Sequence, residues 1–252
     1  MVGIKVLTCR GCGSSKLESI DSLGEFPYAN EFPLNKRGDW QRHRLALVVC
    51  HECTLCQLDE YPDLVTLYSN YIWMTNSSNF VHKYLDGLAE RLASLNAGKF
   101  EKVVEVASND ATFLKKLKDH AHNLIGIEPA KNLIQYYENT EIELISDLFS
   151  SDCVETNQKL LSGTSLIIAR NVLAHVPDIH SFLLACKSCL NLHGFLYLEF
   201  HDGDEIINKL QFDSIYHEHQ SYITERALEL ILHKVGFQVH SSWLGPIGGS
   251  SR

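Results

Sequence analysis

The sequence has no long hydrophobic segment. Its 252 residues contain no window of about 18 uninterrupted apolar residues, the length that a membrane-spanning helix needs. Residues 1–12 carry charged side chains and a pair of cysteines in place of the apolar core of a secretory signal. We therefore expect a cytoplasmic protein without a membrane partner.

Positive charge is also scarce. The 22 Lys and Arg residues stand against 31 Asp and Glu residues, so the formal net charge is −9 at pH 7. An acidic surface repels a phosphate backbone, which argues against general nucleic-acid binding but leaves room for a small anionic substrate in a locally basic pocket. Repeats and low-complexity tracts are absent as well. With 45% hydrophobic residues, the composition is that of a globular protein, and the length predicts about two domains.

Cysteines are concentrated near the N-terminus. Two C-x2-C pairs, Cys9/Cys12 and Cys50/Cys53, predict a closed, structural Zn²⁺ site with four thiolate ligands. So small a module has too little apolar material to fold alone, and bound metal would supply the missing folding energy. Two alternatives stay open: Cys56 forms a competing C-x2-C pair with Cys53, and the cysteines can be unrelated free thiols.

The rest of the chain alternates between apolar runs and amphipathic stretches. We interpret residues 1–68 as the zinc module, residues 69–100 as a helical connector and residues 101–252 as an α/β domain. Strands are expected at 103–107, 124–128, 142–145, 165–169, 195–200 and 237–243, and helices at 76–95, 112–120, 130–138, 179–192 and 224–235. This alternation predicts a doubly wound, mostly parallel sheet with helices on both faces.

Polar residues follow the ends of these strands, where doubly wound sheets bind ligands. The loop after the first strand lacks the G-x-G-x-x-G motif that lets a pyrophosphate approach a helix N-terminus, so a phosphate-free cofactor, S-adenosylmethionine, is favoured over a dinucleotide. Glu128 is placed to accept the hydrogen bonds of a ribose diol, or to start a helix before Pro129, and Asp147 to meet an adenine amino group. The candidate cofactor-binding residues are Glu105, Ala107, Asn109, Asp110, Glu128, Asp147 and Asn171.

Two histidine-bearing segments follow the fourth and fifth strands. The first, residues 171–177, contains His175, and the second contains Tyr216, His217, Glu218 and His219 in succession. The four consecutive residues of the second segment offer a base that is active near neutral pH, a carboxylate to orient it and a phenol to stabilise an oxyanion. The second segment has two other interpretations, a solvated polar turn and a metal site built on its two histidines.

These motifs, in this order, resemble those of the sugar C-methyltransferases, the nucleotide-diphosphate-hexose 3-C-methyltransferases of deoxysugar pathways. The resemblance spans the whole chain. Besides the two C-x2-C pairs, it is carried by Leu23–Asn30, Cys50–Leu58, Tyr71–Trp73, Ser108–Asp110, Asn171–Pro177, Phe212–His219 and Gly248–Arg252. It implies an N-terminal zinc module, a class I methyltransferase domain that uses S-adenosylmethionine, and a nucleotide-linked 4-keto sugar as substrate.

The resemblance also implies roles for individual residues. His219 would remove the proton beside the ketone, and the resulting enolate would attack the sulfonium methyl group. Tyr216, Glu218 and His175 would hold this base and stabilise the enolate oxygen. Trp73 stands where the family often has a second tyrosine, and Tyr71 could supply that phenol instead; the alternative is that Tyr71 is a packed aromatic. We expect the loop tips that carry the base and the cofactor residues to converge over one crevice.

The chain departs from the family pattern at several places. Ala107 and Ala111 replace two glycines of the cofactor loop, and Ile247 replaces a histidine. Family members also continue past the final Gly-Gly-Ser-x-Arg into another domain, which a partner chain or a second copy would have to replace here. Two alternative functions therefore stay open: a methyltransferase for another small metabolite, and a catalytically weakened binding subunit of the same fold.

Overall fold

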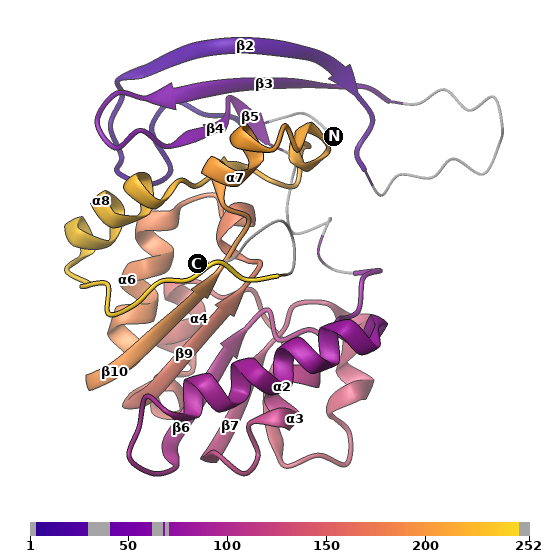
Figure 1. The fold of residues 1–252 in the computed structure, drawn as a ribbon, viewed down its shortest axis with the longest axis vertical. Coiled ribbons are helices and arrows are strands. Elements are labelled where there is room, and N and C mark those ends of the chain that lie inside the picture. The colour runs from indigo at the N-terminus through magenta and orange to yellow at the C-terminus, as the bar shows by residue number, and fades with distance from the viewer. Residues whose placement is uncertain (1–3, 30–40, 62–67, 69–70, 247–252) are drawn as a thin grey trace, which may run out of the picture. The chain divides into compact units, whose positions relative to one another are not determined.

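The computed structural model describes residues 4–29, 41–61, 68 and 71–246, which are drawn in colour in Figure 1. The chain forms two compact units. Unit 1 comprises residues 1–64, 173–180 and 200–252, and unit 2 comprises residues 65–172 and 181–199. The sequence-based division at residues 68 and 100 stays a prediction. The motif Gly248–Arg252, Asn30 and Ile247 lie outside the described residues.

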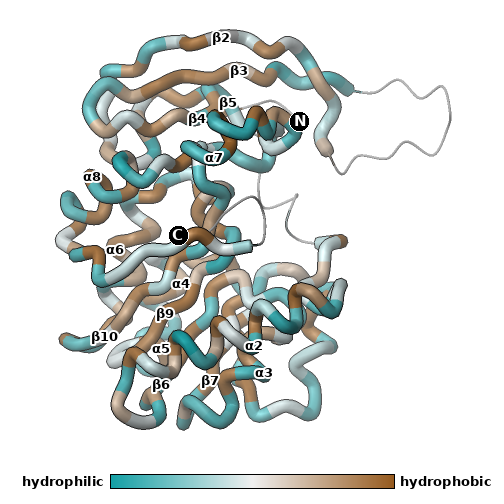
Figure 2. The backbone as a smooth tube through the Cα atoms, viewed as in Figure 1, coloured by the Kyte–Doolittle hydropathy of each residue, from teal (hydrophilic) through white to brown (hydrophobic). Residues whose placement is uncertain are grey.

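Unit 2 is built on a five-stranded parallel sheet. Its strands run in the order β10-β9-β6-β7-β8, so the first strand lies in the middle and the order reverses beside it. Their bounds are β6 (Phe100–Val106), β7 (Ala121–Ile127), β8 (Ile142–Ile145), β9 (Thr164–Arg170) and β10 (Leu190–Glu199). Helices cover both faces of the sheet, and the buried stretches of its strands are apolar. Residues 166–169 of β9 are fully buried, and the tube of this strand is brown in Figure 2. The predicted doubly wound fold is confirmed.

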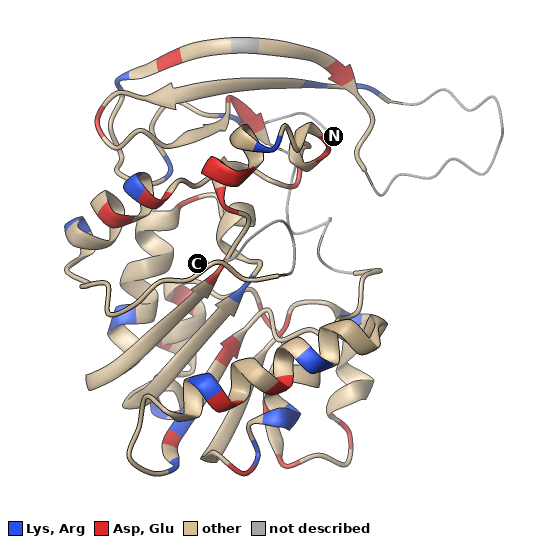
Figure 3. Cartoon of the chain, viewed as in Figure 1, with Lys and Arg blue, Asp and Glu red and all other residues tan. Residues whose placement is uncertain are grey.

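Helices flank this sheet and are shorter than the sequence pattern predicted. They are η1 (Thr75–Ser77), α2 (Asn79–Ala93), α3 (Thr112–Lys116), η2 (Lys131–Tyr137), α4 (Ser151–Thr156), α5 (Gln158–Leu161) and α6 (Ile179–Cys189). The longest, α2, begins where the Ser78 side chain accepts the Val81 amide, a typical N-cap. It buries Leu85, Leu88 and Leu92 and exposes charges of both signs, visible in Figure 3. The helix predicted to end at residue 192 ends at Cys189, where β10 begins.

Unit 1 combines the N-terminal module with the histidine-bearing segment. A four-stranded sheet has the order β11-β4-β3-β2, and a separate pair joins β1 to β5. The elements are β1 (Ile4–Lys5), β2 (Leu17–Phe26), β3 (His43–Cys50), β4 (Cys56–Leu58), β5 (Glu60–Tyr61), η3 (Leu173–His175), α7 (Gly203–Asn208), η4 (Phe212–Ser214), β11 (Ser221–Tyr222) and α8 (Glu225–Val235). A small core joins Leu45 and Leu58 to Ile206 and Tyr222. Residues more than 140 positions apart in sequence, such as Leu58 and Ile206, therefore share one core.

One predicted element is wrong. The structure contains no strand in residues 237–243. Gly236 ends α8 in a left-handed conformation with φ 85°. The alternating apolar residues beyond it find no partner strand within the described residues, and Val239 is 51% exposed. Among the described helices, none is long and apolar enough to cross a membrane.

Candidate functional site

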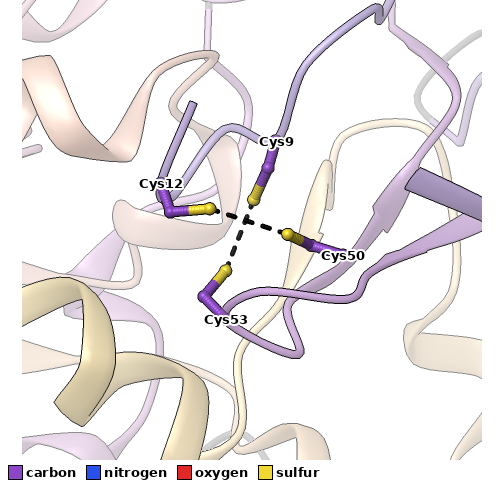
Figure 4. Close-up of side chains that lie close together, drawn as sticks. All are labelled: Cys9, Cys12, Cys50 and Cys53. Carbon is purple, nitrogen blue, oxygen red and sulfur yellow. Dashed lines mark hydrogen bonds between the residues drawn. The ribbon is translucent and has the colours of Figure 1, made fainter. Parts of the chain in front are cut away.

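Four cysteines converge in unit 1. Cys9 and Cys12 lie in the loop after β1, Cys50 ends β3, and Cys53 lies in the turn before β4. Their sulfurs all lie within 4.8 Å of one another, with 3.4 Å between Cys9 and Cys53 and 3.6 Å between Cys12 and Cys50 (Figure 4). A tetrahedral zinc site with Zn–S bonds of about 2.3 Å has sulfurs roughly 3.8 Å apart. The quartet therefore fits Zn²⁺, and Cys56 is not part of it.

Two cationic side chains lie at the turn formed by residues 9–12, which we call the first cysteine knuckle. Arg10 is 4% exposed, and its guanidinium lies 4.6 Å above the Tyr61 ring. Burial lowers the pKa of Arg10 to about 10, against the opposing effect of Tyr61, Cys9 and Tyr222. The exposed Lys234 of α8 donates a hydrogen bond to the backbone carbonyl of Cys12.

The loop after β6 in unit 2 has an unusual backbone. Ala107, Asn109 and Ala111 adopt φ angles of 51°, 53° and 59°, in the left-handed region that favours glycine. Glu128 holds this turn in place: one carboxylate oxygen accepts the Asn109 amide and the other accepts the Ala130 amide, both at 2.8 Å. Burial raises the pKa of Glu128. The two alanines thus occupy positions where the backbone itself prefers glycine.

The loop's polar side chains bond mainly to the neighbouring backbone. Asn109 accepts the Thr75 amide at 2.9 Å and donates to the Trp73 carbonyl at 3.1 Å. Asp110 accepts the amides of Asn76 at 2.9 Å and Thr112 at 3.1 Å. Their side chains therefore tie the loop to the segment that precedes α2.

A buried charge network lies beside this loop. Arg170 at the end of β9 pairs with Glu105 at 3.7 Å and with Glu199 at 3.4 Å. Glu199 also accepts the hydroxyls of Tyr84 at 2.6 Å and Tyr197 at 3.1 Å. Burial raises the pKa of Glu105 to about 8, partly offset by Arg170. Sequence reasoning missed Arg170 and Glu199, although both are charged residues at the carboxyl ends of predicted strands.

The remaining two candidate cofactor residues lie at strand ends in the same unit. The Asn171 amide donates to the Glu199 carbonyl at 2.7 Å, and its side chain donates to the Glu199 carboxylate at 3.4 Å. Asp147 is exposed, and its carboxylate accepts the Leu148 amide at 2.7 Å. Asn171 therefore belongs to the charge network, whereas Asp147 lies apart at the surface.

His219 is the centre of a polar cluster in unit 1. Its Nδ1 lies 2.9 Å from the Ser214 carbonyl, and its Nε2 lies 2.9 Å from the Tyr216 hydroxyl. A carbonyl only accepts, so Nδ1 carries the proton and Nε2 accepts from Tyr216. Burial, with additional effects of His175 and His201, lowers the pKa of His219 to about 3. The imidazole is therefore neutral at pH 7, with its lone pair on Nε2.

Two further imidazoles stand edge to face with His219. The ring centroid of His175 lies 5.0 Å from that of His219, and the centroid of His201 lies 5.7 Å away. The Nδ1 of His175 donates to the Glu218 carbonyl at 2.9 Å, and burial lowers its pKa to about 4. Sequence reasoning missed His201, whose position directly after the fifth strand was the available signal.

Glu218 and His217, which flank one another between Tyr216 and His219, make different contacts. Glu218 is buried, and its backbone carbonyl orients His175. His217 turns to His43, whose carbonyl lies 3.2 Å from its Nε2, and to the Tyr28 ring at 5.0 Å. Among the described residues, a metal-ligand group of three or more occurs only at the cysteines, so the predicted alternative of a metal site on His217 and His219 is not assembled.

Tyr71 belongs to unit 2. Its backbone amide donates to the Asn132 side chain at 3.0 Å, its carbonyl accepts from the same side chain at 2.8 Å, and its ring lies 6.0 Å from that of Tyr68. These contacts attach Tyr71 to the segment after β7. Its proposed role as a phenol at the reaction centre stays a prediction.

Comparisons with known families match both parts of the chain. Residues 78–242 match the family described as "Methyltransferase domain", and residues 9–68 match the family described as "Putative zinc binding domain". The second match covers all four cysteines of the quartet.

One curated relative is the C-methyltransferase NovU of Streptomyces niveus. It is 26% identical over 249 residues, which is 96% of this chain and 59% of the relative. The chain thus spans about three fifths of the length of this relative.

Solved structures share the fold at low identity. The plantazolicin methyltransferase BpumL, crystallised with SAH and a pentazolic desmethylPZN analog, has a TM-score of 0.53 at 14% identity and covers 69% of this chain and 72% of its own. BpumL in complex with a monoazolic desmethylPZN analog and SAH has a TM-score of 0.52 at 13% sequence identity, and the match covers 64% of this chain and 65% of BpumL. The complex between the Haloferax volcanii Trm112 methyltransferase activator and a methyltransferase also has a TM-score of 0.52 at 13% sequence identity, and the match covers 64% of this chain and 71% of the matched chain.

Proposed function

The chain belongs to the methyltransferase domain family, and from this membership we propose that it is an S-adenosylmethionine-dependent C-methyltransferase whose substrate is a nucleotide-linked 4-keto deoxysugar. The observation that carries the proposal is the His219 cluster, in which a buried, neutral imidazole has its lone pair on Nε2. The curated relative NovU, a C-methyltransferase, supports transfer to carbon.

The residues of unit 2 fit an S-adenosylmethionine site. Glu105 has a buried carboxyl oxygen, Oε2, with no hydrogen-bond partner among the described residues. Burial raises the pKa of this group and so favours its neutral form, and an ammonium group bound at Oε2 would favour the ionised carboxylate and be bound by it. Glu128 retains a lone pair on each oxygen for ribose hydroxyls. Asp147 is exposed at the next strand end and is available to an adenine amino group. When bound, the cofactor supplies an electrophilic methyl group.

We assign the role of base to His219. Its Nε2 takes the proton from the carbon beside the ketone, and the electrons of the broken C–H bond form the enolate. The enolate carbon would then form the new bond to the methyl group, while the bond between that methyl group and the sulfonium sulfur would break and leave the sulfur as a neutral thioether. Burial disfavours an isolated imidazolium. The enolate provides the opposite charge at the moment the proton arrives, so the pair forms together.

Tyr216 and His175 have different roles in this scheme. The Tyr216 hydroxyl, which donates to Nε2 in the resting state, first turns to donate to the ketone oxygen and so frees the Nε2 lone pair. It then stabilises that oxygen as the enolate forms. His175 uses its N–H on the Glu218 carbonyl, so in its neutral form it has no second N–H to offer an oxyanion. We therefore assign His175 and Glu218 to positioning His219.

A second candidate function rests on the strained cofactor loop. Alanine at two left-handed positions is consistent with a binding subunit that has lost turnover. Isothermal titration with S-adenosylhomocysteine separates the two: absence of heat at millimolar ligand would favour the binding subunit. A methyltransferase for another small metabolite would bind the cofactor product but leave 4-keto sugar nucleotides unchanged. The predicted partner chain or second copy is tested by the mass of the purified protein in solution.

The decisive test of the base is substitution of His219. We expect His219→Asn to abolish methyl transfer to a 4-keto sugar nucleotide and, in D₂O, exchange of the proton beside the ketone, while cofactor-product binding is retained. The matched control is His193→Asn, at an exposed position of β10, which should leave turnover unchanged. Turnover retained in the His219 variant would remove it as the base.

A further inference from the structure

Arg10 is a buried cation whose guanidinium has no carboxylate partner among the residues that the structure describes. It is 4% exposed, and neither Nε nor either Nη atom has a hydrogen-bond partner among the described residues. Burying an unpaired charge is costly, and buried charges in folded proteins are normally paired. The face of the Tyr61 ring, at 4.6 Å, provides part of the compensation. The ring carries no net charge, so the buried guanidinium still needs a full negative charge near it.

The cysteine quartet supplies that charge when it holds zinc. Four thiolates and one Zn²⁺ sum to a net charge of −2. Three of the ligands, Cys9, Cys50 and Cys53, are buried, with exposures of 3%, 1% and 3%. A buried dianion needs nearby cations as much as Arg10 needs an anion. Arg10 stands between two of the ligands, Cys9 and Cys12, in sequence. The buried guanidinium is therefore bound to the same turn that holds two of the four thiolates.

A second cation lies at the same knuckle. Lys234 of α8 donates to the Cys12 carbonyl, and its side chain is exposed. Arg10 and Lys234 together carry +2, equal and opposite to the loaded quartet. Because solvent screens an exposed charge much more than a buried one, Arg10 should contribute far more than Lys234.

We propose that Arg10, assisted by Lys234, is the charge-balancing group of the metal site, so that metal retention depends on the guanidinium as well as on the four thiolates. The proposal rests on zinc occupying the quartet and is independent of methyl transfer.

The backbone around Arg10 allows its side chain to be tested alone. Its amide donates to Gln57 Oε1 at 2.9 Å, and its carbonyl accepts the first amides of α6, from Ile179 at 2.9 Å and His180 at 3.3 Å. None of these bonds involves the guanidinium. A substitution at residue 10 therefore leaves them available and changes mainly charge and packing.

The experiment measures zinc release from the zinc-loaded 252-residue chain into excess chelator with a colorimetric zinc indicator. We expect Arg10→Met to release zinc about 10- to 100-fold faster, the range for partners that support metal ligands. Arg10→Lys should stay near the parent rate because it keeps the charge. Lys234→Met should change the rate by no more than about threefold, as expected for an exposed charge. The matched control is Lys16→Met, an exposed cation of the same module that pairs with Glu52.

The two Arg10 variants distinguish charge from packing. If the side chain served only to pack on Tyr61, the apolar methionine would retain zinc and lysine would release it, and this result would overturn the proposal. Equal rates for Arg10→Met and the parent would also overturn it. If Arg10→Met does not fold, Arg10→Gln replaces it, and its far-ultraviolet circular dichroism is compared with that of Arg10→Lys before release is measured. Methyl transfer is not a readout, so failure here and failure of the proposed function remain distinguishable.

Discussion

At the scale of single residues, the neutral histidines of unit 1 couple its stability to pH. In the folded state the pKa of His175 is about 4 and that of His219 is about 3, both lowered from 6.5 by burial. Below pH 6.5 the unfolded chain therefore binds protons that the folded chain does not. The stabilisation is fully present above pH 6.5 and is lost progressively as the pH falls toward 4.

We expect this loss in urea unfolding followed between pH 7.5 and pH 5. The free energy of unfolding should fall with pH more steeply in the parent than in His219→Gln, which removes one of the two titrations. His193→Gln, an exposed control, should follow the parent. Parallel curves for the parent and the His219 variant would show that this imidazole accepts a proton in the folded state as readily as in the unfolded one.

The two alanines of the cofactor loop should respond differently to glycine. A left-handed conformation costs alanine roughly 1–2 kcal/mol, and glycine loses about 0.5–1 kcal/mol to chain entropy. Ala107 is exposed, so we expect Ala107→Gly to raise the free energy of unfolding by about 0.5–1 kcal/mol. Ala111 is fully buried, and losing its methyl group costs about 0.8 kcal/mol, so Ala111→Gly should be near neutral.

The sign of the effect is checked by denaturant unfolding. Ala93→Gly, at the end of α2, is the comparison, since glycine in a helix costs about 1 kcal/mol relative to alanine. A stabilising Ala93→Gly or a destabilising Ala107→Gly would contradict the assignment of backbone strain to the loop.

At the scale of elements, the packing of α8 against the first cysteine knuckle requires a glycine. A Cβ atom on Gly11 would lie 2.4 Å from Ile231 Cδ1 and 2.9 Å from Ile231 Cγ1, and Ile231 is fully buried. We expect Gly11→Ala to destabilise unit 1 by about 1–3 kcal/mol through overpacking. The readout is thermal unfolding of the zinc-loaded protein.

A double-mutant cycle tests this contact. Ile231→Val removes Cδ1 and alone should cost about 0.5–1.5 kcal/mol. Combined with Gly11→Ala, it should recover part of the loss, so the two effects are not additive. Strict additivity would place the cause of the Gly11→Ala loss away from α8.

At the scale of the whole molecule, the two units depend on metal differently. Unit 2 is built on a five-stranded parallel sheet with buried apolar strands, whereas unit 1 holds the cysteine quartet, whose sulfurs join the loop after β1 to the end of β3 and the turn before β4. Chelation of zinc should therefore raise hydrogen exchange across β2, β3 and β4 while leaving β6, β7 and β9 protected. The measurement is hydrogen exchange followed by mass spectrometry, with and without chelator.

The matched variants for this prediction are Cys50→Ser and Cys56→Ser. The first removes a quartet sulfur and should reproduce the effect of the chelator. The second changes the neighbouring cysteine that lies outside the quartet and should bind one zinc per chain. Equal protection in all samples would show that unit 1 folds without metal.

Local patterns were sufficient to predict much of this protein from its sequence. A C-x2-C pair turns tightly enough to bring two sulfurs to one ion, and an apolar run followed by an amphipathic stretch is a strand followed by a helix wherever it occurs. The quartet, the five parallel strands and the polar loops at their ends all follow from such short-range rules. The strand expected at residues 237–243 failed because alternation alone does not provide a partner strand.

Only the tertiary structure decided which distant residues meet. It placed the His201 ring against that of His219, the Glu199 carboxylate beside Arg170, and the Arg10 guanidinium over the Tyr61 ring. It also directed the His217 side chain toward His43, away from the cluster around His219. These contacts depend on how separate segments pack, because close packing and the pairing of buried charges are satisfied between elements that may be far apart in the chain. Spacing within one segment determines which side chains share a turn or a face, whereas the partners of each side chain are determined by the fold.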